Sequence, residues 1–190
     1  RRAARCGSRG DDEGEAHAGG ACLTRARQPE RLRARSVREQ LGLIPLQALA
    51  QRVSSAKICI NTKTHSLINE GILAYVCFEK DDNEEVIEKF ISKIINFSFF
   101  TGDRSIMSAN LKEIKGELMI VSQFTLSAIT NKGNKPSFHK AASTEKANYL
   151  YDLLIERLNE CPIRCQSGVF GSDMDIHSVN VGPVTFSFKI

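Results

Sequence analysis

The stretch that decides the fold is Glu117-Leu118-Met119-Ile120-Val121-Ser122-Gln123-Phe124-Thr125. Its unbroken apolar run is typical of a strand that is buried on both faces of a sheet. We therefore expect it to be the central strand of the protein. The strand ends in polar groups, and the hydroxyls of Ser122, Thr125 and Ser127 lie where loops commonly expose reactive side chains on a rigid scaffold. The same hydroxyls can instead satisfy backbone groups at the end of the strand.

An amphipathic helix is predicted before this strand. Apolar residues recur at steps of three and four from Val86 to Ile95, and Asp82 or Asn83 can cap the start of the helix. A polar loop then leads to strand-like residues near Ile106, which we expect to form a short strand.

A second amphipathic helix is predicted after the strand. It begins near Ser143 or Thr144, buries a stripe from Ala147 to Leu158, and cannot continue through Pro162. The two helices therefore flank the central strand along the chain, and each presents one apolar face to a common core.

Further strands are predicted near both ends of the chain. Residues 47–53 and 56–60 alternate as two strands, and the more continuous apolar run at 71–78 indicates a deeper one. Residues 174–179 and the regularly alternating 184–190 predict two more. Strands separated by two helices in this order predict an α+β fold, a compact single domain of mainly antiparallel sheets.

Charge and composition separate residues 1–45 from this domain. The segment holds ten Arg, no Lys and six acidic residues, and its low content of β-branched and aromatic residues predicts disorder. From Leu46 onward, sixteen basic residues balance sixteen acidic ones, so any RNA contact must come from a local patch. We expect a domain at 46–190 and an extension that is a transit peptide, an RNA-binding arm or a start-site artefact. The acidic residues at 11–15 weigh against a transit peptide.

Neither a membrane segment nor a metal site is predicted. The longest apolar runs fall far short of the roughly 20 residues that cross a bilayer. Six cysteines at irregular spacings favour reduced thiols, and the three-residue spacer between Cys161 and Cys165 departs from a metal-binding or redox C-x-x-C pair. We therefore expect a cytoplasmic protein without a cofactor.

Two loops admit two interpretations each. The segment 131–136 holds Lys132 and Lys135, which can bind phosphate or be ordinary solvated side chains. Gly182-Pro183 can simply start a strand, or it can form a tight kink that exposes main-chain carbonyls to an ammonium group.

Two motifs carry a resemblance to a known family. They are Ser122-Gln123-Phe124-Thr125-Leu126 and Asn180-Val181-Gly182-Pro183-Val184-Thr185. Weaker matches are Gln51-Arg52-Val53, the run from Lys132 to His139, and Phe170-Gly171 with Met174. In order and approximate spacing, the chain from about Leu46 resembles the D-aminoacyl-tRNA deacylases. Val181 stands where that family commonly has an acidic residue, and residues 1–45 have no counterpart.

The resemblance implies an activity and an assembly. The activity is hydrolysis of the ester in D-aminoacyl-tRNA, which provides chiral proofreading in translation. Glycyl-tRNA mischarged on tRNA-Ala is a second implied substrate. The assembly is a homodimer with its pocket at the subunit interface, where the strand bearing Thr125 meets the cis Gly182-Pro183 turn of the other subunit. The carbonyls of that turn hold the α-amino group of the substrate and leave no room for an L side chain.

The resemblance also implies roles for individual residues. The catalytic segment is Ser122, Gln123, Phe124 and Thr125. The substrate-binding residues are Gly182, Pro183, Phe170, Met174 and Arg52, and the expected tRNA contacts are Lys132 and Lys135. Two mechanisms stay open, an acyl-enzyme on Thr125 and attack by water assisted by a ribose hydroxyl of the tRNA. A non-catalytic interaction domain that keeps the dimeric fold is the rival interpretation.

Overall fold

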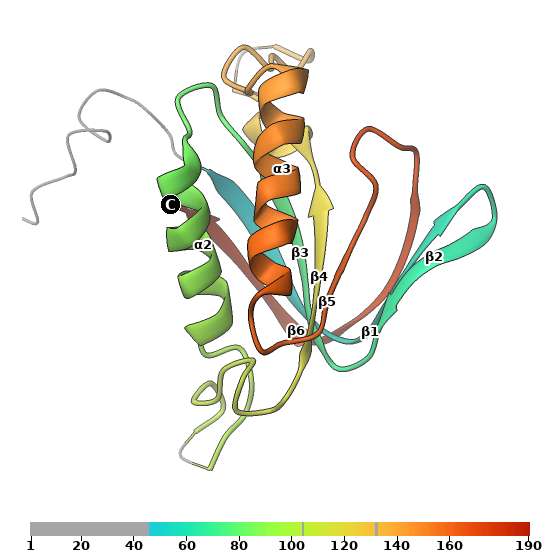
Figure 1. Cartoon of the computed structure of the whole chain (residues 1–190), viewed down its shortest axis with the longest axis vertical. Helices are drawn as coiled ribbons and strands as arrows, with labels where there is room; N and C mark the ends of the chain where they lie inside the picture. The colour runs from blue at the N-terminus through green and yellow to red at the C-terminus, as the bar shows by residue number, and fades with distance from the viewer. Residues whose placement is uncertain (1–45, 104, 132) are drawn as a thin grey trace, which may run out of the picture. The chain divides into compact units, whose positions relative to one another are not determined.

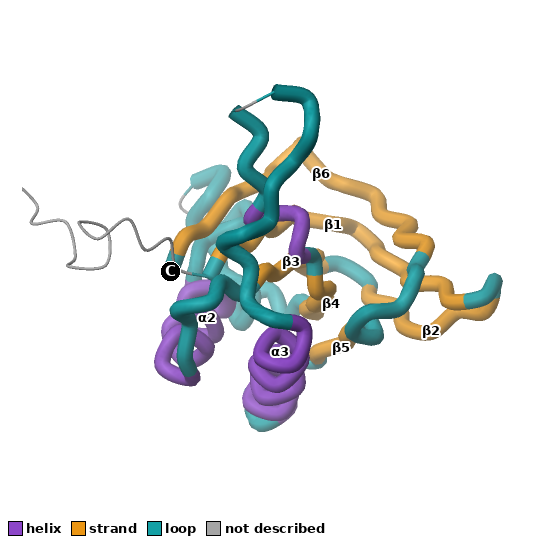
Figure 2. Tube along the Cα trace, turned by 90° about the horizontal axis from the view of Figure 1, so that it is seen from above, coloured by secondary structure: helices purple, strands orange, loops and turns teal. Residues whose placement is uncertain are grey.

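The computed structural model describes residues 46–190, except 104 and 132. Its strands are β1 (Gln47–Ile60), β2 (Lys63–Ile68), β3 (Gly71–Cys77), β4 (Glu117–Ser122), β5 (Cys165–Ser167) and β6 (Asp175–Lys189). Two helices, α2 (Glu84–Asn96) and α3 (Thr144–Asn159), lie on the same face of the sheet (Figures 1 and 2). The predicted α+β class with two main helices is confirmed. No helix in the described part is long and apolar enough to span a membrane.

The sheet is mixed, which corrects the expectation of mainly antiparallel sheets. Strand β1 pairs antiparallel with β2, β3 and β6. Strand β4, however, lies parallel between β3 and β5. The helices are the reason, because α2 connects β3 to β4 and α3 lies between β4 and β5. A helical crossover brings the chain back in the same direction, and so it joins parallel strands.

One long strand replaces the two that were predicted at 47–53 and 56–60. The strand β1 changes the face of its buried side chains along its length, with Ala50 in the cluster beneath the helices and Ile58 in a second cluster. Its register with β6 shifts between Gln51 and Ser55. Bulges of this kind interrupt the alternation of side chains without ending the strand.

Strands β3 and β4 are buried on both faces, as their continuous apolar runs predicted. Ile72 and Ile120 belong to the cluster that packs against the helices. Leu73 and Met119 belong to the second cluster, together with Ile58 and residues of β2 and β6. The sheet therefore curls so that its β1, β2 and β6 portion covers the face that the helices leave free.

The predicted helices are confirmed, with one correction at a cap. Ser143 caps α3 as expected, since its Oγ accepts a hydrogen bond from Lys146 N at 3.3 Å. Asn83 occupies the N-cap position of α2, but its side chain makes no capping bond. The Asp82 carboxylate instead accepts hydrogen bonds from the backbone N–H groups of Leu46 (3.2 Å) and Glu79 (2.8 Å).

Two other local predictions are wrong. Ile106 lies in a turn and is 75% exposed, so the short strand expected there does not form. Strand β4 ends at Ser122 rather than at Thr125, and residues Phe124–Ser127 form a short 3-10 helix, η1. The backbone of Phe124 and Thr125 therefore leaves the sheet at the end of β4.

Candidate active site

A hollow of about 480 Å³ lies where β4 ends. It is bounded by the ends of β3 and β4, the start of α3 and the segment between β5 and β6. Five of the predicted site residues line it, namely Ser122, Gln123, Phe124, Phe170 and Met174. Thr125 follows directly, in η1, and its side chain is exposed.

The η1 turn is tied to the body of the protein through its backbone. Gln123 N donates to Val76 O on β3 at 2.7 Å. The Phe124 carbonyl accepts from the Ser127 hydroxyl at 2.9 Å and from the Cys77 thiol at 3.5 Å. These bonds hold the turn at the pocket although the Phe124 side chain is 59% exposed.

Two neighbouring N–H groups of the turn have no acceptor in the described part of the chain. Within the described residues, neither Phe124 N nor Thr125 N donates a hydrogen bond to a protein atom. Consecutive free N–H groups in a tight turn form an anion-binding concavity. Such a pair can stabilise the oxyanion that forms when an ester carbonyl is attacked.

The Thr125 hydroxyl has no general base beside it among the described residues. Its Oγ accepts a hydrogen bond from the side-chain amide of Gln123, a group that cannot remove a proton. The nearest candidate base along the chain, His139, contacts the Ser137 hydroxyl through Nδ1 at 3.0 Å. A nucleophilic hydroxyl needs an adjacent base, so the geometry provides no activation for Thr125.

Gly182 and Pro183 lie in a bulge of β6. Gln51 pairs with Thr185 and Val53 with Asn180, so residues 181–184 stand opposite Arg52 alone. The Gly182–Pro183 peptide bond is cis, and both residues are exposed. The bulge therefore projects from the edge of the sheet.

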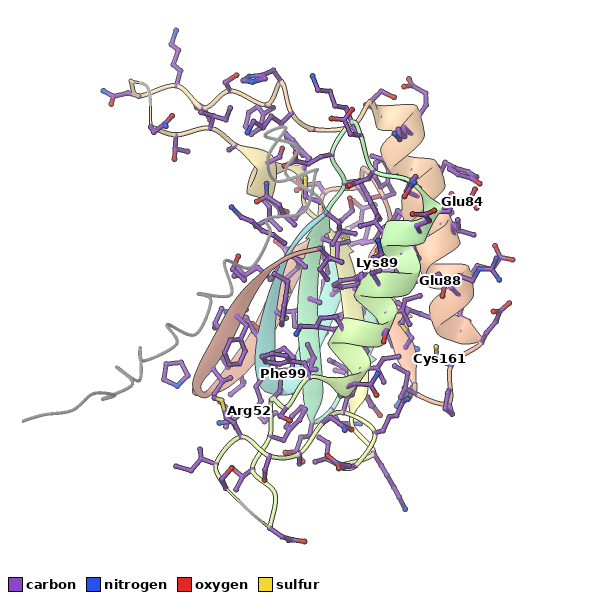
Figure 3. The ribbon with its side chains drawn as sticks, turned by 90° about the vertical axis from the view of Figure 1, so that its left-hand side faces the viewer. Arg52, Glu84, Glu88, Lys89, Phe99 and Cys161 are labelled. Atoms are coloured by element: carbon purple, nitrogen blue, oxygen red, sulfur yellow. The ribbon has the colours of Figure 1, made fainter. Side chains whose placement is uncertain are left out.

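Side chains support this bulge from behind. Arg52 donates through Nε to Val181 O at 3.2 Å and through Nη1 to Phe99 O at 3.0 Å, and Figure 3 places Arg52 beside Phe99. The Asn180 side chain accepts from Val184 N at 3.2 Å through Oδ1. The two side chains hold the bulge without covering its outer surface.

The pocket and the bulge do not meet within one chain. Arg52 is in register with Ile72, at the start of β3, whereas Ser122 is in register with Val76, near its end. The two positions are about 13 Å apart along the strand at a rise of roughly 3.3 Å per residue. At the level of the bulge, β1 and β3 also separate β6 from β4. The chain therefore places its two motifs at opposite ends of the sheet.

A hairpin beside η1 carries one of the two predicted tRNA contacts. Lys135 lines a hollow with His139 and Lys140, while Lys132 lies outside the described residues. The hairpin is held next to the candidate site by the Phe138 ring, whose centroid is 5.0 Å from that of Phe124.

Sequence reasoning missed Cys77, and it named Ser127 only as one of three hydroxyls near the end of the central strand. Both are buried, and both bind the carbonyl of the turn that carries the first motif. Burial raises the pKa of the Cys77 thiol. The position of Cys77 at the end of a buried strand could have indicated that it lies at the pocket. That inference requires knowing that β3 and β4 are neighbours in the sheet.

Comparison with known proteins identifies the family. The family profile described as D-Tyr-tRNA(Tyr) deacylase matches residues 49–189. The chain belongs to this family. D-aminoacyl-tRNA deacylases of Pseudoalteromonas atlantica and Haemophilus influenzae are 44% and 42% identical to it, over 75% of this chain and 98% and 99% of the relatives. The predicted family and the predicted class of enzyme, a hydrolase, are confirmed.

Solved structures agree on the fold. A structure described as c-Myc DNA Unwinding Element Binding Protein aligns with a TM-score of 0.70 and 33% identity, covering 75% of this chain and 97% of that one. A probable eukaryotic D-amino acid tRNA deacylase aligns with a TM-score of 0.64 over 76% of this chain and 99% of that one. The second is only 19% identical, so it supports the fold alone.

Proposed function

We propose that this chain hydrolyses the ester that joins a D-amino acid to the 3′ end of tRNA, releasing free tRNA and the amino acid. The observation that carries the proposal is the pair of acceptor-free N–H groups, Phe124 N and Thr125 N, beside a hollow of about 480 Å³. A developing oxyanion is the charge that such a pair is suited to hold. The names of the relatives supply the chemical class of the substrate.

The reaction uses water as the nucleophile. Water adds to the ester carbonyl carbon, the carbonyl oxygen becomes an oxyanion on the two N–H groups, and the bond to the ribose oxygen then breaks. The leaving ribose oxygen takes up a proton, and a neighbouring ribose hydroxyl of the tRNA assists the transfer. This route is favoured over an acyl-enzyme because the only described partner of Thr125 Oγ is an amide donor.

A second copy of the chain completes the site. The bulge at Gly182 and Pro183 is exposed, is braced from behind by Arg52, and lies at the end of the sheet opposite the pocket of its own chain. Insertion of the bulge into the pocket of another copy would bring the two motifs together. A two-fold symmetric dimer would form two such sites.

Selectivity for D-amino acids over L-amino acids follows from this insertion. The carbonyls of the inserted turn bind the α-ammonium group of the substrate, and the turn then occupies the space that an L side chain would need. Steric rejection of the unwanted isomer is a form of specificity that requires no contact with the accepted side chain. D-aminoacyl and glycyl esters fit, including glycyl-tRNA mischarged on tRNA-Ala. Phe170 and Met174, on the pocket wall, contact the adenine or the aminoacyl group.

The tRNA contacts come from the hairpin next to η1. Lys135 and Lys140 line its hollow, and Lys132 precedes them in the sequence. Because the domain from Leu46 onward has no net charge, these lysines provide the local positive patch that a phosphate backbone requires. The domain at 46–190 holds both motifs, so the extension at 1–45 is not needed for hydrolysis.

The test is a deacylation assay on the full chain and on residues 46–190. Both proteins are expected to release D-Tyr from D-Tyr-tRNA and glycine from Gly-tRNA, and to leave L-Tyr-tRNA intact. Equal rates for the two proteins would support the domain assignment. Failure to release D-Tyr or glycine by a folded protein would contradict the enzyme proposal and favour a non-catalytic interaction domain.

A further inference from the structure

The Phe124 carbonyl is held from inside the protein by two side chains that come from different elements. Ser127, at the end of η1, is 3% exposed and donates through Oγ at 2.9 Å. Cys77, the last residue of β3, is 2% exposed, and its Sγ lies 3.5 Å from Phe124 O and 3.7 Å from Phe78 O, so the Phe124 oxygen is the nearer acceptor for the thiol proton. The two donors therefore fix the oxygen of one peptide group between η1 and the sheet.

That peptide group also contains the Thr125 N–H. In a trans peptide the C=O and N–H bonds point in opposite directions within one plane. Donors that fix the Phe124 oxygen toward the buried side therefore fix the Thr125 N–H toward the opposite side, where no described protein atom accepts it. Hydrogen bonds to a carbonyl oxygen also polarise the peptide, which strengthens its N–H as a donor.

We propose that Ser127 and Cys77 are positioning residues, which orient the Thr125 N–H toward the ester oxygen of the substrate. This inference rests on the proposed hydrolysis and adds to it the two side chains that aim its oxyanion donor. Their contribution belongs to the transition state, because the oxyanion forms there and the ground-state carbonyl carries less charge.

The chemistry of the two residues suits this task. A hydroxyl and a protonated thiol can each donate one hydrogen bond from a buried position. Burial raises the pKa of the Cys77 thiol, which keeps its proton in place near neutral pH. The backbone bonds of the turn flank this peptide, from Gln123 N to Val76 O and from Ala128 N to Thr125 O, and the two buried side chains bind its oxygen directly.

The decisive experiment compares Ser127→Thr with Ser127→Val in the full chain. The two side chains have nearly the same shape, and only threonine keeps the hydroxyl. With D-Tyr-tRNA, we expect Ser127→Val to lower kcat about tenfold with KM within about twofold, the pattern of an interaction made only in the transition state. Ser127→Thr should recover most of kcat. Equal kcat values for the two variants would overturn the proposal.

Ser66→Ala is the matched control for removal of a buried hydroxyl. Ser66 is 6% exposed, lies on β2, and its Oγ has no hydrogen-bond partner within the described part of the chain. We expect its kcat to match that of the unsubstituted protein. A loss equal to that of Ser127→Val would mean that kcat reports general stability, which would overturn the positioning role.

Cys77→Ser and Cys77→Ala provide an independent pair if the Ser127 variants do not fold. The serine variant keeps a donor and should retain more kcat than the alanine variant, and the reverse order would count against the proposal. NMR supplies a readout that needs no activity, since the carbonyl ¹³C resonance of Phe124 should move upfield when its donors are removed. An unshifted resonance in Ser127→Val contradicts the positioning geometry, whereas an inactive unsubstituted protein contradicts the proposed function instead.

Discussion

The turn at 122–127 and the bulge at 180–185 carry the two sequence motifs, and they are supported in different ways. In the turn, buried side chains bind the Phe124 carbonyl and leave neighbouring N–H groups free at a hollow. In the bulge, Arg52 and Asn180 bind the backbone from behind, and Gly182 and Pro183 are exposed. One region is therefore a concave surface, and the other is a projection.

This difference teaches how a small domain can specify a site that it does not contain. Each motif is rigid by itself, because its backbone is held by hydrogen bonds from its own chain. Their positions at opposite ends of the sheet make an intramolecular site impossible without rearrangement of β1 and β3. A second copy supplies the missing half without any change in the fold.

The largest effect is expected from Gly182→Ala. Gly182 has φ +118°, and a Cβ there would lie 2.8 Å from both Arg52 Nη2 and Val184 Cγ2. The substitution strains the backbone and displaces the bulge, and a misplacement of about 1 Å can cost on the order of 100-fold in rate. We expect kcat/KM for D-Tyr-tRNA to fall by about that factor.

Gly133→Ala is the matched control, since Gly133 also has a positive φ (69°) but a Cβ there meets nothing within 4 Å. It should cost some stability, as any such substitution does, and leave kcat nearly unchanged, and any effect on tRNA binding by its hairpin should be confined to KM. If both variants lose activity equally, the conformation of the bulge has no special role, and the contrast between the two regions fails.

Mixing two inactive variants tests whether the bulge of one copy serves the pocket of another. Ala147 lines the hollow on α3, and Ala147→Phe should fill it. In a re-equilibrated equimolar mixture with Gly182→Ala, half of the dimers are mixed and each has one intact site. Activity should return to about a quarter of the unsubstituted level.

Native mass spectrometry should accompany this experiment, to verify that the subunits have exchanged. Mixed dimers without recovered activity would mean that each chain uses its own bulge. A protein that stays monomeric at assay concentrations while hydrolysing D-Tyr-tRNA would have the same consequence.

The sequence predicted the parts of the fold that depend on local pattern. The spacing of apolar residues along the chain predicts the buried faces of α2 and α3. It also predicts that β4 is buried on both faces. These predictions are confirmed. The direction of strand pairing, the bulges of β1 and the early end of β4 depend on neighbours in space. For the same reason, the motif residues at the pocket and the Ser127 hydroxyl could be named in advance, but Cys77 and the carbonyl that it shares with Ser127 could not.

Thr125→Ala tests whether the turn works through its backbone or through a side chain. Loss of a true nucleophile costs on the order of 10,000-fold in kcat or more. Alanine keeps the Thr125 N–H and removes only a hydroxyl that is bound to the Gln123 amide. We expect kcat to stay within about tenfold of the unsubstituted value. Burst kinetics with a trapped acyl-enzyme would instead establish Thr125 as the nucleophile.

The smallest effect concerns the pH dependence of stability at the pocket end of the sheet. Burial raises the pKa of Asp82 from 3.8 to about 6, although its carboxylate accepts bonds from Leu46 N and Glu79 N. Because the folded state then binds a proton more tightly than the unfolded state, this carboxyl stabilises the fold as pH falls through about 6 and loses that contribution as pH rises.

Urea unfolding of the full chain and of Asp82→Asn at pH 7 and pH 5 measures this contribution. The asparagine variant should be less stable overall, because an amide oxygen cannot replace both acceptors. Between pH 7 and pH 5, the unsubstituted protein should gain about 1 kcal/mol relative to the variant. Parallel pH profiles would mean that Asp82 stays ionised between its two N–H donors. The ionised carboxylate would then fix the backbone next to β1 and β3 through charge-assisted hydrogen bonds, as the Arg52 guanidinium fixes the backbone of the bulge.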